Sequence, residues 1–493
     1  MRHTNLGRKL RFEALETRRL LDGNVTTSFS GGVLTLHGDS TSNGVEIFNT
    51  SANVVEVLGL NQGTPATPGG TSPPTTIDGG TNGLFQHVVS VVVDFTNGTT
   101  GVNQGDDAVV LTNLTLSGSV SVQLGNGNDI VGLGQFDNSG GLVDSAVDGT
   151  QGTVRIDNGL VINLQSGNNT VVAKSVTLDG PAGPNLTITG GGVDSISFDH
   201  VAVNHAIAIT DTGSTTIDMT QGLCNSLRVS LGIGNDSVSI DHTTVGHTLS
   251  IKADAGDDSV SLDNIGAQSL QLDLGAGNDH AMVTNAAITH DTMIKGDDGN
   301  DTVSLDTVTT RPLNVNLGDG DDILTLNGIT SKMTEIHGGT GADTISASNA
   351  HATIFMVLGG SGADQITLDS ITASKRISLD AGADVDAVTV DNSAARSMSI
   401  DLGAGNDTLS LGTDTVARKT LLLGSGGTDT ITADTLASGK LSAILGTGDD
   451  EISLANSTIA GKAKLRGGPG SDTYTDATGN TFGKLDIKQI ETT

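Results

Sequence analysis

The feature that most constrains the fold is a G-x-G-x-D run that returns every 21 or 22 residues through the second half of the chain. Twelve copies end at Asp236, Asp258, Asp279, Asp301, Asp322, Asp343, Asp364, Asp386, Asp407, Asp429, Asp450 and Asp472. Two earlier copies end at Asp107 and Asp129, 22 residues apart. A fixed period of this length is typical of solenoids, in which each repeat forms one coil that stacks on its neighbours.

The run decays between Asp129 and Asp236. Asn169, Asp194 and Thr215 end its degenerate copies, and the spacings from Asp194 to Thr215 to Asp236 are still 21 and 21. The sequence therefore predicts that the coils continue through this region, although the repeated carboxylate is no longer present in every coil.

Each repeat reads as turn, short strand, second turn and longer strand. After Asp258, the apolar residues Val260 and Leu262 alternate with serines, and a second alternating run, Leu270-x-Leu-x-Leu274, follows the turn at Asp263–Asn264. Alternation with a period of two indicates half-buried strands, and Gly marks the turns. We predict an all-β parallel β-solenoid, either a β-roll or a right-handed β-helix, of about seventeen coils. Two sheets or three remain open, and turns such as Asp263–Asn264 and Asn456–Ser457 close the edge opposite the G-x-G-x-D runs.

The composition fits stacked coils and excludes several partners. The 68 Gly, nine Phe, one Tyr and no Trp indicate a core of small aliphatic side chains. A formal charge of −32 would repel nucleic acid, and no apolar stretch approaches the roughly 18 residues of a membrane span. Seven of the 56 acidic residues are Glu, so 49 are Asp. A short carboxylate suits an ion held in a tight turn, and calcium accepts such carboxylates together with backbone carbonyls.

Three runs match the nonapeptide G-G-x-G-x-D-x-U-x in full: residues 338–346, 359–367 and 467–475. Others carry Leu first, as in 274–279 and 402–407, and Asp384 replaces the Gly two residues before Asp386. These turns resemble those of RTX, or hemolysin-type calcium-binding, repeat proteins. The resemblance departs from the family in one respect, because the nonapeptide appears here once per coil rather than twice.

The resemblance implies several Ca²⁺ ions between consecutive turns, along one edge only. The Asp residues that end the fourteen runs would be ligands, together with carbonyls of neighbouring glycines: Gly339, Gly341, Gly360, Gly362, Gly403, Gly405, Gly446, Gly448, Gly468 and Gly470. Electrostatics adds a separate reason. Carboxylates stacked roughly 5 Å apart repel by roughly 0.8 kcal/mol per neighbouring pair even in water, and cations between them would turn repulsion into coordination.

The chain divides into four predicted regions. Residues 1–22 form a basic targeting-like segment, residues 23–100 a β cap region with a Pro/Gly loop at 63–80, residues 101–235 the degenerate coils, and residues 236–493 the regular array. Residues Phe12 to Leu21 resemble the LEPR-XLL segment that opens surface and secreted proteins of certain bacteria, with Thr17 in place of Pro. An amphipathic or disordered basic head is the alternative.

These features predict a non-enzymatic calcium-binding repeat protein, secreted or at the bacterial cell surface, with a structural or adhesive role. Surface polysaccharide and other matrix proteins are its candidate partners. Two alternatives stay open: a degenerate β-helix lyase or hydrolase acting on polysaccharide, and a calcium-triggered folding passenger of an export system. The scattered histidines, such as His242 and His247, form no catalytic motif, and the single Cys224 allows no internal disulfide.

Overall fold

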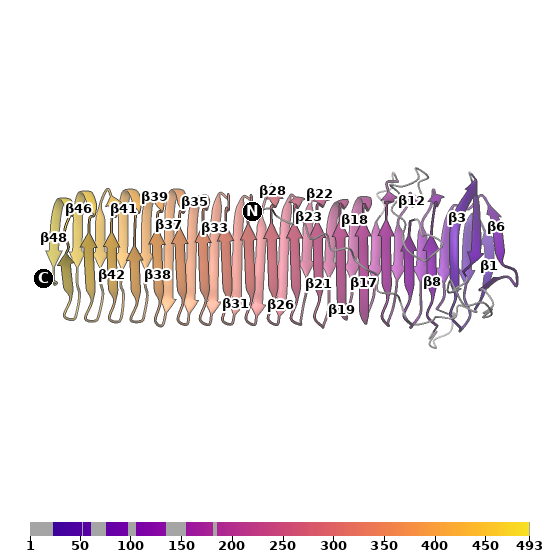
Figure 1. Cartoon of the computed structure of the whole chain (residues 1–493), viewed down its shortest axis with the longest axis horizontal. Coiled ribbons are helices and arrows are strands. Elements are labelled where there is room, and N and C mark those ends of the chain that lie inside the picture. The colour runs from indigo at the N-terminus through magenta and orange to yellow at the C-terminus, as the bar shows by residue number, and fades with distance from the viewer. Residues whose placement is uncertain are drawn as a thin grey trace, which may run out of the picture.

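A computed structural model describes residues 23–51, 53–60, 75–96, 105–134, 154–180 and 185–492. The described part is a straight rod of stacked β-coils (Figure 1). It contains no helix and has about 16 turns, so the predicted parallel β-solenoid is confirmed, with a coil count close to the expected seventeen. Among the described residues, no helix is long and apolar enough to span a bilayer.

The rod begins with antiparallel strands. β1 (Asn24–Ser30) pairs with β2 (Val33–His37), and β4 (Val54–Gly59) lies between β3 (Gly44–Ser51) and β6 (Asn82–Gln86). The structure differs from the expected loop at 63–80 in one place, because Thr76–Ile77 forms β5 and the Ile77 side chain is buried. Residues 61–74 of that loop, and the targeting-like segment 1–22, lie outside the described residues.

One sheet collects the strand that follows each G-x-G-x-D turn, and we call it the first sheet. Its parallel strands are β8 (Ala108–Leu111), β11 (Ile130–Leu133), β14 (Thr170–Lys174), β17 (Val193–Asp199), β19 (Ser214–Thr220), β21 (Ser237–Asp241), β24 (Ser259–Asp263), β27 (His280–Thr284), β30 (Thr302–Asp306), β32 (Ile323–Asn327), β34 (Thr344–Ser348), β36 (Gln365–Asp369), β38 (Ala387–Asp391), β40 (Thr408–Leu411), β42 (Thr430–Asp434), β45 (Glu451–Ala455), β47 (Thr473–Asp476) and β49 (Glu491–Thr492).

The second sheet collects the longer strand of each coil and the short run before it. Its long strands are β7 (Ser90–Asp94), β10 (Val120–Gln123), β13 (Leu160–Asn163), β16 (Leu186–Thr189), β18 (Ala202–Thr210), β20 (Leu223–Ser230), β23 (Thr248–Lys252), β26 (Ser269–Ala276), β29 (Thr292–Asp298), β31 (Pro312–Asp319), β33 (Met333–Thr340), β35 (His351–Ser361), β37 (Thr372–Ala383), β39 (Ala394–Asp401), β41 (Thr415–Leu423), β44 (Leu441–Ile444), β46 (Thr458–Arg466) and β48 (Thr481–Lys488). The short runs are β9 (Thr115–Leu116), β12 (Val154–Ile156), β15 (Val176–Leu178), β22 (Thr244–Val245), β25 (Gly266–Ala267), β28 (Ala287–Ile288) and β43 (Ala437–Ser438).

The second sheet bends at a corner within each coil. In β37 the pairing register shifts between Ala373 and Arg376, and β39, β41 and β46 show the same irregularity. Such a bulge kinks a strand and redirects the chain. The rod therefore has two hydrogen-bonded sheets, and the bend divides the second into a short face and a long face.

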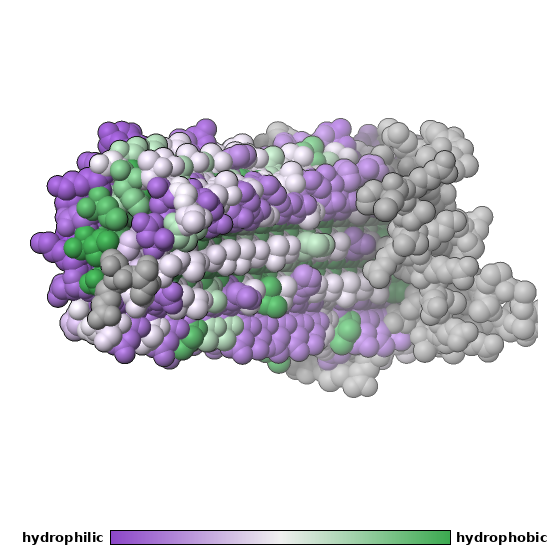
Figure 2. Space-filling model, turned by 60° about the vertical axis from the view of Figure 1, so that its left-hand side comes forward, coloured by the Kyte–Doolittle hydropathy of each residue, from purple (hydrophilic) through white to green (hydrophobic). Residues whose placement is uncertain are grey.

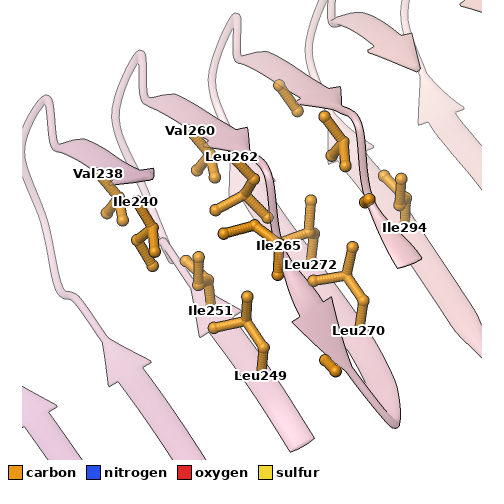
Figure 3. Close-up of a cluster of buried hydrophobic side chains, with 14 of the residues drawn as sticks. Val238, Ile240, Leu249, Ile251, Val260, Leu262, Ile265, Leu270, Leu272 and Ile294 are labelled. Atoms are coloured by element: carbon orange, nitrogen blue, oxygen red, sulfur yellow. The ribbon is translucent and has the colours of Figure 1, made fainter. Parts of the chain in front are cut away.

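The core consists of apolar side chains stacked coil on coil. Val238 lies in register with Val260, and Ile240 with Leu262, so each side chain packs on its counterpart in the next coil (Figure 3). These four side chains are at most 1% exposed. The alternating residues of each strand therefore supply most of the core, and buried turn residues such as Ile265 add to it.

The surface repeats along the rod as the core does. Figure 2 shows rows of hydrophilic residues running parallel to the rod axis, and hydrophobic surface at the end that carries the last coils. The last described coil leaves Phe482, Leu485 and Ile487 only partly buried against the core.

Candidate functional site

The Asp residues that end the G-x-G-x-D runs form one buried row, which we call the inner ladder. From Asp236 to Asp472 their exposed fractions are only 1–3%. In each of the eleven steps, the backbone N–H of one Asp donates to Oδ1 of the Asp in the next coil, at 2.7–3.2 Å. The carboxylates therefore point into the rod, rather than standing in water along its edge.

The inner ladder extends into the degenerate coils. Asn43 N–H donates to Asp107 Oδ1 at 2.7 Å, and the N–H of Asp107 donates to Asp129 Oδ1 at 2.8 Å. The N–H of Asp129 donates to Asn169 Oδ1, and that of Asn169 to Asp194 Oδ1, both at 2.9 Å. The two early Asp residues thus belong to the same row as the array. Asn169 shows that an amide oxygen can replace the carboxylate as acceptor.

The ladder is interrupted between Asp194 and Thr215, because the Thr215 hydroxyl donates to the Gly213 carbonyl within its own turn. The Thr215 N–H still donates to Asp236 Oδ1 at 2.5 Å. This turn has three residues between Asp211 and Thr215, where the next has four between Leu231 and Asp236. The shorter turn places the buried Asp211 where the next coil has Leu231, since Thr210 pairs with Ser230.

Asp211 faces the carboxylate of Asp194 across Gly190. A Cβ on Gly190 would lie 2.2 Å from Asp194 Oδ2 and 2.4 Å from Asp211 Oδ2. Burial raises the pKa of Asp194 to about 7, and the neighbouring Asp211 adds to the rise. Asp211 could not be predicted from the repeat, because it lies in the column of Leu231 rather than in that of the final Asp.

The second carboxylate oxygen of each ladder Asp, Oδ2, differs from Oδ1 in its surroundings. In all twelve Asp of the array, Oδ2 is buried and has no hydrogen-bond partner among the described residues. A buried carboxylate oxygen without a donor is costly while it carries charge, so it must gain a proton or a cation, or remain strained. The array repeats this situation once per coil.

The pKa values follow from this burial. Burial raises the pKa of Asp236, Asp301, Asp343, Asp386 and Asp429 to about 7. The pKa values of Asp258 and Asp322 rise to about 6 for the same reason. Neighbouring carboxylates add to each rise, and the N–H donated to Oδ1 opposes it. Near neutral pH the row is therefore close to taking up protons.

The turn backbone explains the glycines. All ten Gly predicted to supply carbonyls have positive φ, between 93° and 158°. A Cβ on Gly341 would lie 2.1 Å from the Gly320 carbonyl oxygen of the preceding coil, so only Gly fits this stacked turn. Asp384 is the exception in this column, with φ of 80°.

The first position of the nonapeptide is Gly, Ala or Leu in the array, and packing explains how Gly and Leu differ there. A Cβ on Gly338 would lie 2.4 Å from Asp343 Oδ2 and 2.3 Å from the carbonyl oxygen of Gly359. Where Leu stands instead, as at Leu274 and Leu317, its side chain is fully buried in the core. In the Gly copies, the carboxylate oxygen thus lies beside the backbone, close to a carbonyl of the next coil.

A second, exposed ladder runs along the same turns, and we call it the outer ladder. The N–H of Asp257 donates to Asn235 Oδ1 at 3.1 Å, that of Asn278 to Asp257 Oδ1 at 2.9 Å, and that of Asn300 to Asn278 Oδ1 at 3.0 Å. Its bonds run from each coil back to the one before, opposite to the inner ladder. The repeated Asn or Asp just before the final Asp was the sequence signal for it.

The acidic groups stand in single file rather than in clusters. No three His, Cys, Asp or Glu side chains of the described residues gather as a metal-binding group. The histidines lie apart, with His200 beside Asp199 and His242 beside Asp241 on the surface. Cys224 is buried, and burial raises its pKa to about 12, so it stays a thiol.

No protein-family model matches this chain, and a search of curated proteins finds no match. The resemblance to RTX repeats therefore rests on the repeated nonapeptide itself, and the structure assigns the chain to the parallel β-solenoids.

Proposed function

We propose that this protein is a non-enzymatic, calcium-stabilised β-solenoid that serves as a structural or adhesive element, secreted or at the bacterial cell surface. The observation that carries the proposal is the row of twelve buried Oδ2 atoms without hydrogen-bond partners. A divalent cation supplies the missing counter-charge and, unlike a proton, can serve two consecutive carboxylates.

The residues present offer the types of oxygen ligand that calcium accepts. The inner ladder would provide carboxylate oxygens from consecutive coils, and the turn glycines would provide carbonyls. Asp343 Oδ2 and the Gly359 carbonyl oxygen both lie close to the position that a Cβ on Gly338 would occupy. Calcium accepts such mixed oxygen sets, whereas zinc favours His and Cys.

Calcium stoichiometry tests the proposal. The purified full-length chain is dialysed against calcium-free and calcium-containing buffers, bound calcium is measured by elemental analysis, and strand content is followed by circular dichroism. We expect several ions per chain and a higher melting temperature with calcium. The proposal would be refuted if the chain bound no calcium from a buffer with millimolar calcium and its melting temperature did not change.

The chain itself offers a matched control. Since Asn169 accepts the ladder hydrogen bond in the natural sequence, the double variant Asp343→Asn, Asp364→Asn should keep that bond while removing two charges. We expect it to bind fewer ions than the parent chain and to keep its strand signal. The double variant Asp306→Asn, Asp369→Asn, at two half-buried positions outside the inner ladder, should leave the stoichiometry unchanged.

The alternative, a polysaccharide lyase or hydrolase, gains no particular support from the described residues, because their buried carboxylates stand mostly in the repeating row of the inner ladder, with Asp211 and Asp414 outside it. Reducing-end assays on polysaccharides would test it.

A further inference from the structure

A cationic ridge runs along one corner of the rod, although acids outnumber Lys and Arg by 56 to 24 in the whole chain. It lies in the second sheet at the bend between the short and long faces. We define the cationic ridge by eight residues: Lys375, Arg376, Arg396, Arg418, Lys419, Lys440, Lys462 and Lys484. Seven are exposed, and Lys462 is partly buried.

Strand register stacks these cations on one another. Arg376 is in register with Ser397, and Ser397 with Lys419. The column continues through Lys440, because Thr420 N–H donates to the Lys440 carbonyl, and then through Lys462, which pairs with Lys484. Five cations therefore occupy one column over six successive coils.

A second column lies directly beside the first. Lys375, Arg396 and Arg418 each precede a member of the first column, and Gly439, Gly461 and Gly483 continue it in the later coils. A Cβ on Gly439 would lie 2.6 Å from the Ala417 carbonyl oxygen, so the glycines keep the backbone close-packed there. The ridge is thus two cations wide in the coils of Arg376 and Lys419, and one cation wide in the coil between them and in the later coils.

Apart from Lys462, the ridge cations form no ion pair with an acidic side chain of the described residues. The strand segments 372–378, 394–400, 415–422, 437–444 and 458–465 contain no Asp or Glu. Among the described residues, only Lys462 of the ridge forms an ion pair, with Asp486 at 2.5 Å. Like charges stacked at the coil spacing of roughly 4.8 Å repel one another. In a chain so rich in Asp, a row of unpaired cations points to an anionic partner.

We infer that the cationic ridge binds a linear anionic polysaccharide, of the polyuronate class, laid along the rod axis. A polyuronate carries one carboxylate per sugar, and each sugar of an extended chain advances by close to one coil spacing. Successive carboxylates of the polymer would therefore lie opposite the cations of successive coils. The inference rests on the proposed surface role and names the chemistry of the partner that such a role would hold.

The shape and composition of the ridge favour this polymer over nucleic acid. Duplex DNA is far wider than one or two side chains and would reach the neighbouring acidic faces, which repel it. Single-stranded nucleic acid is usually held by stacked aromatic side chains. Among the strand segments that carry the ridge, the one aromatic residue is Phe482, which is partly buried against the core.

Fluorescence anisotropy tests the inference, with a labelled octagalacturonate added to the full-length chain in about 50 mM salt. The double variant Lys419→Glu, Lys440→Glu should bind octagalacturonate at least tenfold more weakly. The slope of log K against log salt concentration should fall by the contribution of about two ionic contacts. Lys419→Gln, Lys440→Gln should weaken binding less, and serves if the charge reversal fails to fold. Arg228→Glu, Lys295→Glu, two exposed cations on the long face of earlier coils, should bind like the parent chain.

Several outcomes would overturn the inference. These are no octagalacturonate binding by the parent chain, binding unchanged by both ridge variants, or tighter binding of single-stranded or duplex DNA. Self-association that the ridge variants abolish, without glycan binding by the parent, would assign the ridge to a second copy of the chain. Calcium stoichiometry of the ridge variants should stay that of the parent. Lost glycan binding with calcium binding intact therefore concerns the ridge alone, and the reverse concerns the proposed function.

Discussion

The degenerate coils and the regular array stack in the same way, yet they differ in what lies inside their turns. Asn169 and Thr215 occupy ladder positions in the degenerate coils, whereas all twelve positions of the array carry Asp. Both regions keep parallel strands on either side of the turn, as β14 with β17 and β36 with β38 show. A carboxylate is therefore not needed to build a coil.

The comparison separates two roles of the ladder residue. Accepting the N–H of the preceding coil requires one oxygen, which Asn supplies as well as Asp. The second carboxylate oxygen adds nothing to the hydrogen bonding among the described residues, and it is buried. Twelve retained carboxylates thus indicate a role that an amide cannot fill, and cation binding is the role we propose.

Calcium removal should separate the two regions most strongly. A site filled at a hundredfold excess of ligand over Kd contributes about 2.7 kcal/mol, so a few emptied sites match the whole stability of an ordinary domain, about 5–15 kcal/mol. We expect chelation to abolish hydrogen-exchange protection in strands β21 to β47, and to leave β14 and β17 less affected. Equal loss in both regions would contradict a calcium role confined to the array.

Acid should rescue the calcium-free array. Burial raises the pKa of Asp301 and Asp343 to about 7, from about 3.8 in the unfolded chain. The folded state then binds more protons than the unfolded state between about pH 4 and pH 7, so the free energy of unfolding falls as pH rises through this window. Thermal melts in chelator should show a higher midpoint at pH 5 than at pH 7.5. With calcium bound, this dependence should shrink.

A side chain at a turn glycine should break the array locally. Gly341→Ala places a Cβ 2.1 Å from the Gly320 carbonyl oxygen at a φ of 116°. We expect a loss of about 2–4 kcal/mol in the free energy of unfolding, measured by urea denaturation. Gly266→Ala is the matched control, because a Cβ there meets nothing closer than 3.9 Å, so its effect should be small.

Exchanging the ladder residues between the two regions tests their difference directly. Asp343→Asn should stabilise the calcium-free protein at pH 7.5 by about 1 kcal/mol, because it removes a buried charge while keeping the acceptor. With calcium, the same variant should be less stable than the parent. Asn169→Asp should do the reverse. Calorimetric melts with and without calcium give all four values, and signs that do not invert between the two conditions would refute the proposed division of roles.

The smallest effect concerns the one array turn that lacks its glycine. Asp384 adopts a φ of 80° where the other array turns have Gly, and its charge raises the pKa values of Asp364 and Asp386. Asp384→Gly should stabilise the protein by about 1 kcal/mol in urea denaturation, since it relieves both backbone strain and like-charge repulsion. Asp384→Asn, which removes only the charge, should recover a smaller part of that gain.

Most of the fold could be predicted from the repeat period. Spacings of 21 and 22, with apolar alternation around Val260 and Leu272, suffice to predict parallel coils and the side chains that form the core. The antiparallel start of the rod was not predicted, because β3 and β4 show the same alternation as a stacked coil and only their partners differ. Pairing direction leaves no mark on a single strand's pattern.

The candidate site was predicted in position but not in orientation. The spacing places Asp343 and its counterparts in one row, yet whether a turn carboxylate faces water or the core depends on the donors around it. Here the N–H of the preceding coil draws Oδ1 inward. Asp211 was missed because it stands in the column of Leu231, four residues before the ladder residue Thr215, where the other coils of the repeat carry no acid. The cationic ridge was missed because register shifts at the corner bring its members into line.

The one-way direction of the inner ladder gives the two tips of a growing rod different chemistry. A rod that assembles from its first coil onward always presents a bare amide N–H, and the incoming coil brings the carboxylate that satisfies it. A rod that assembles from its last coil backward presents a bare carboxylate, which repels the next acidic turn until a cation or proton neutralises it. Growth from the first coil therefore brings each carboxylate in with the docking coil, whereas growth from the last coil starts from a carboxylate already in place, and both directions end with the same buried row.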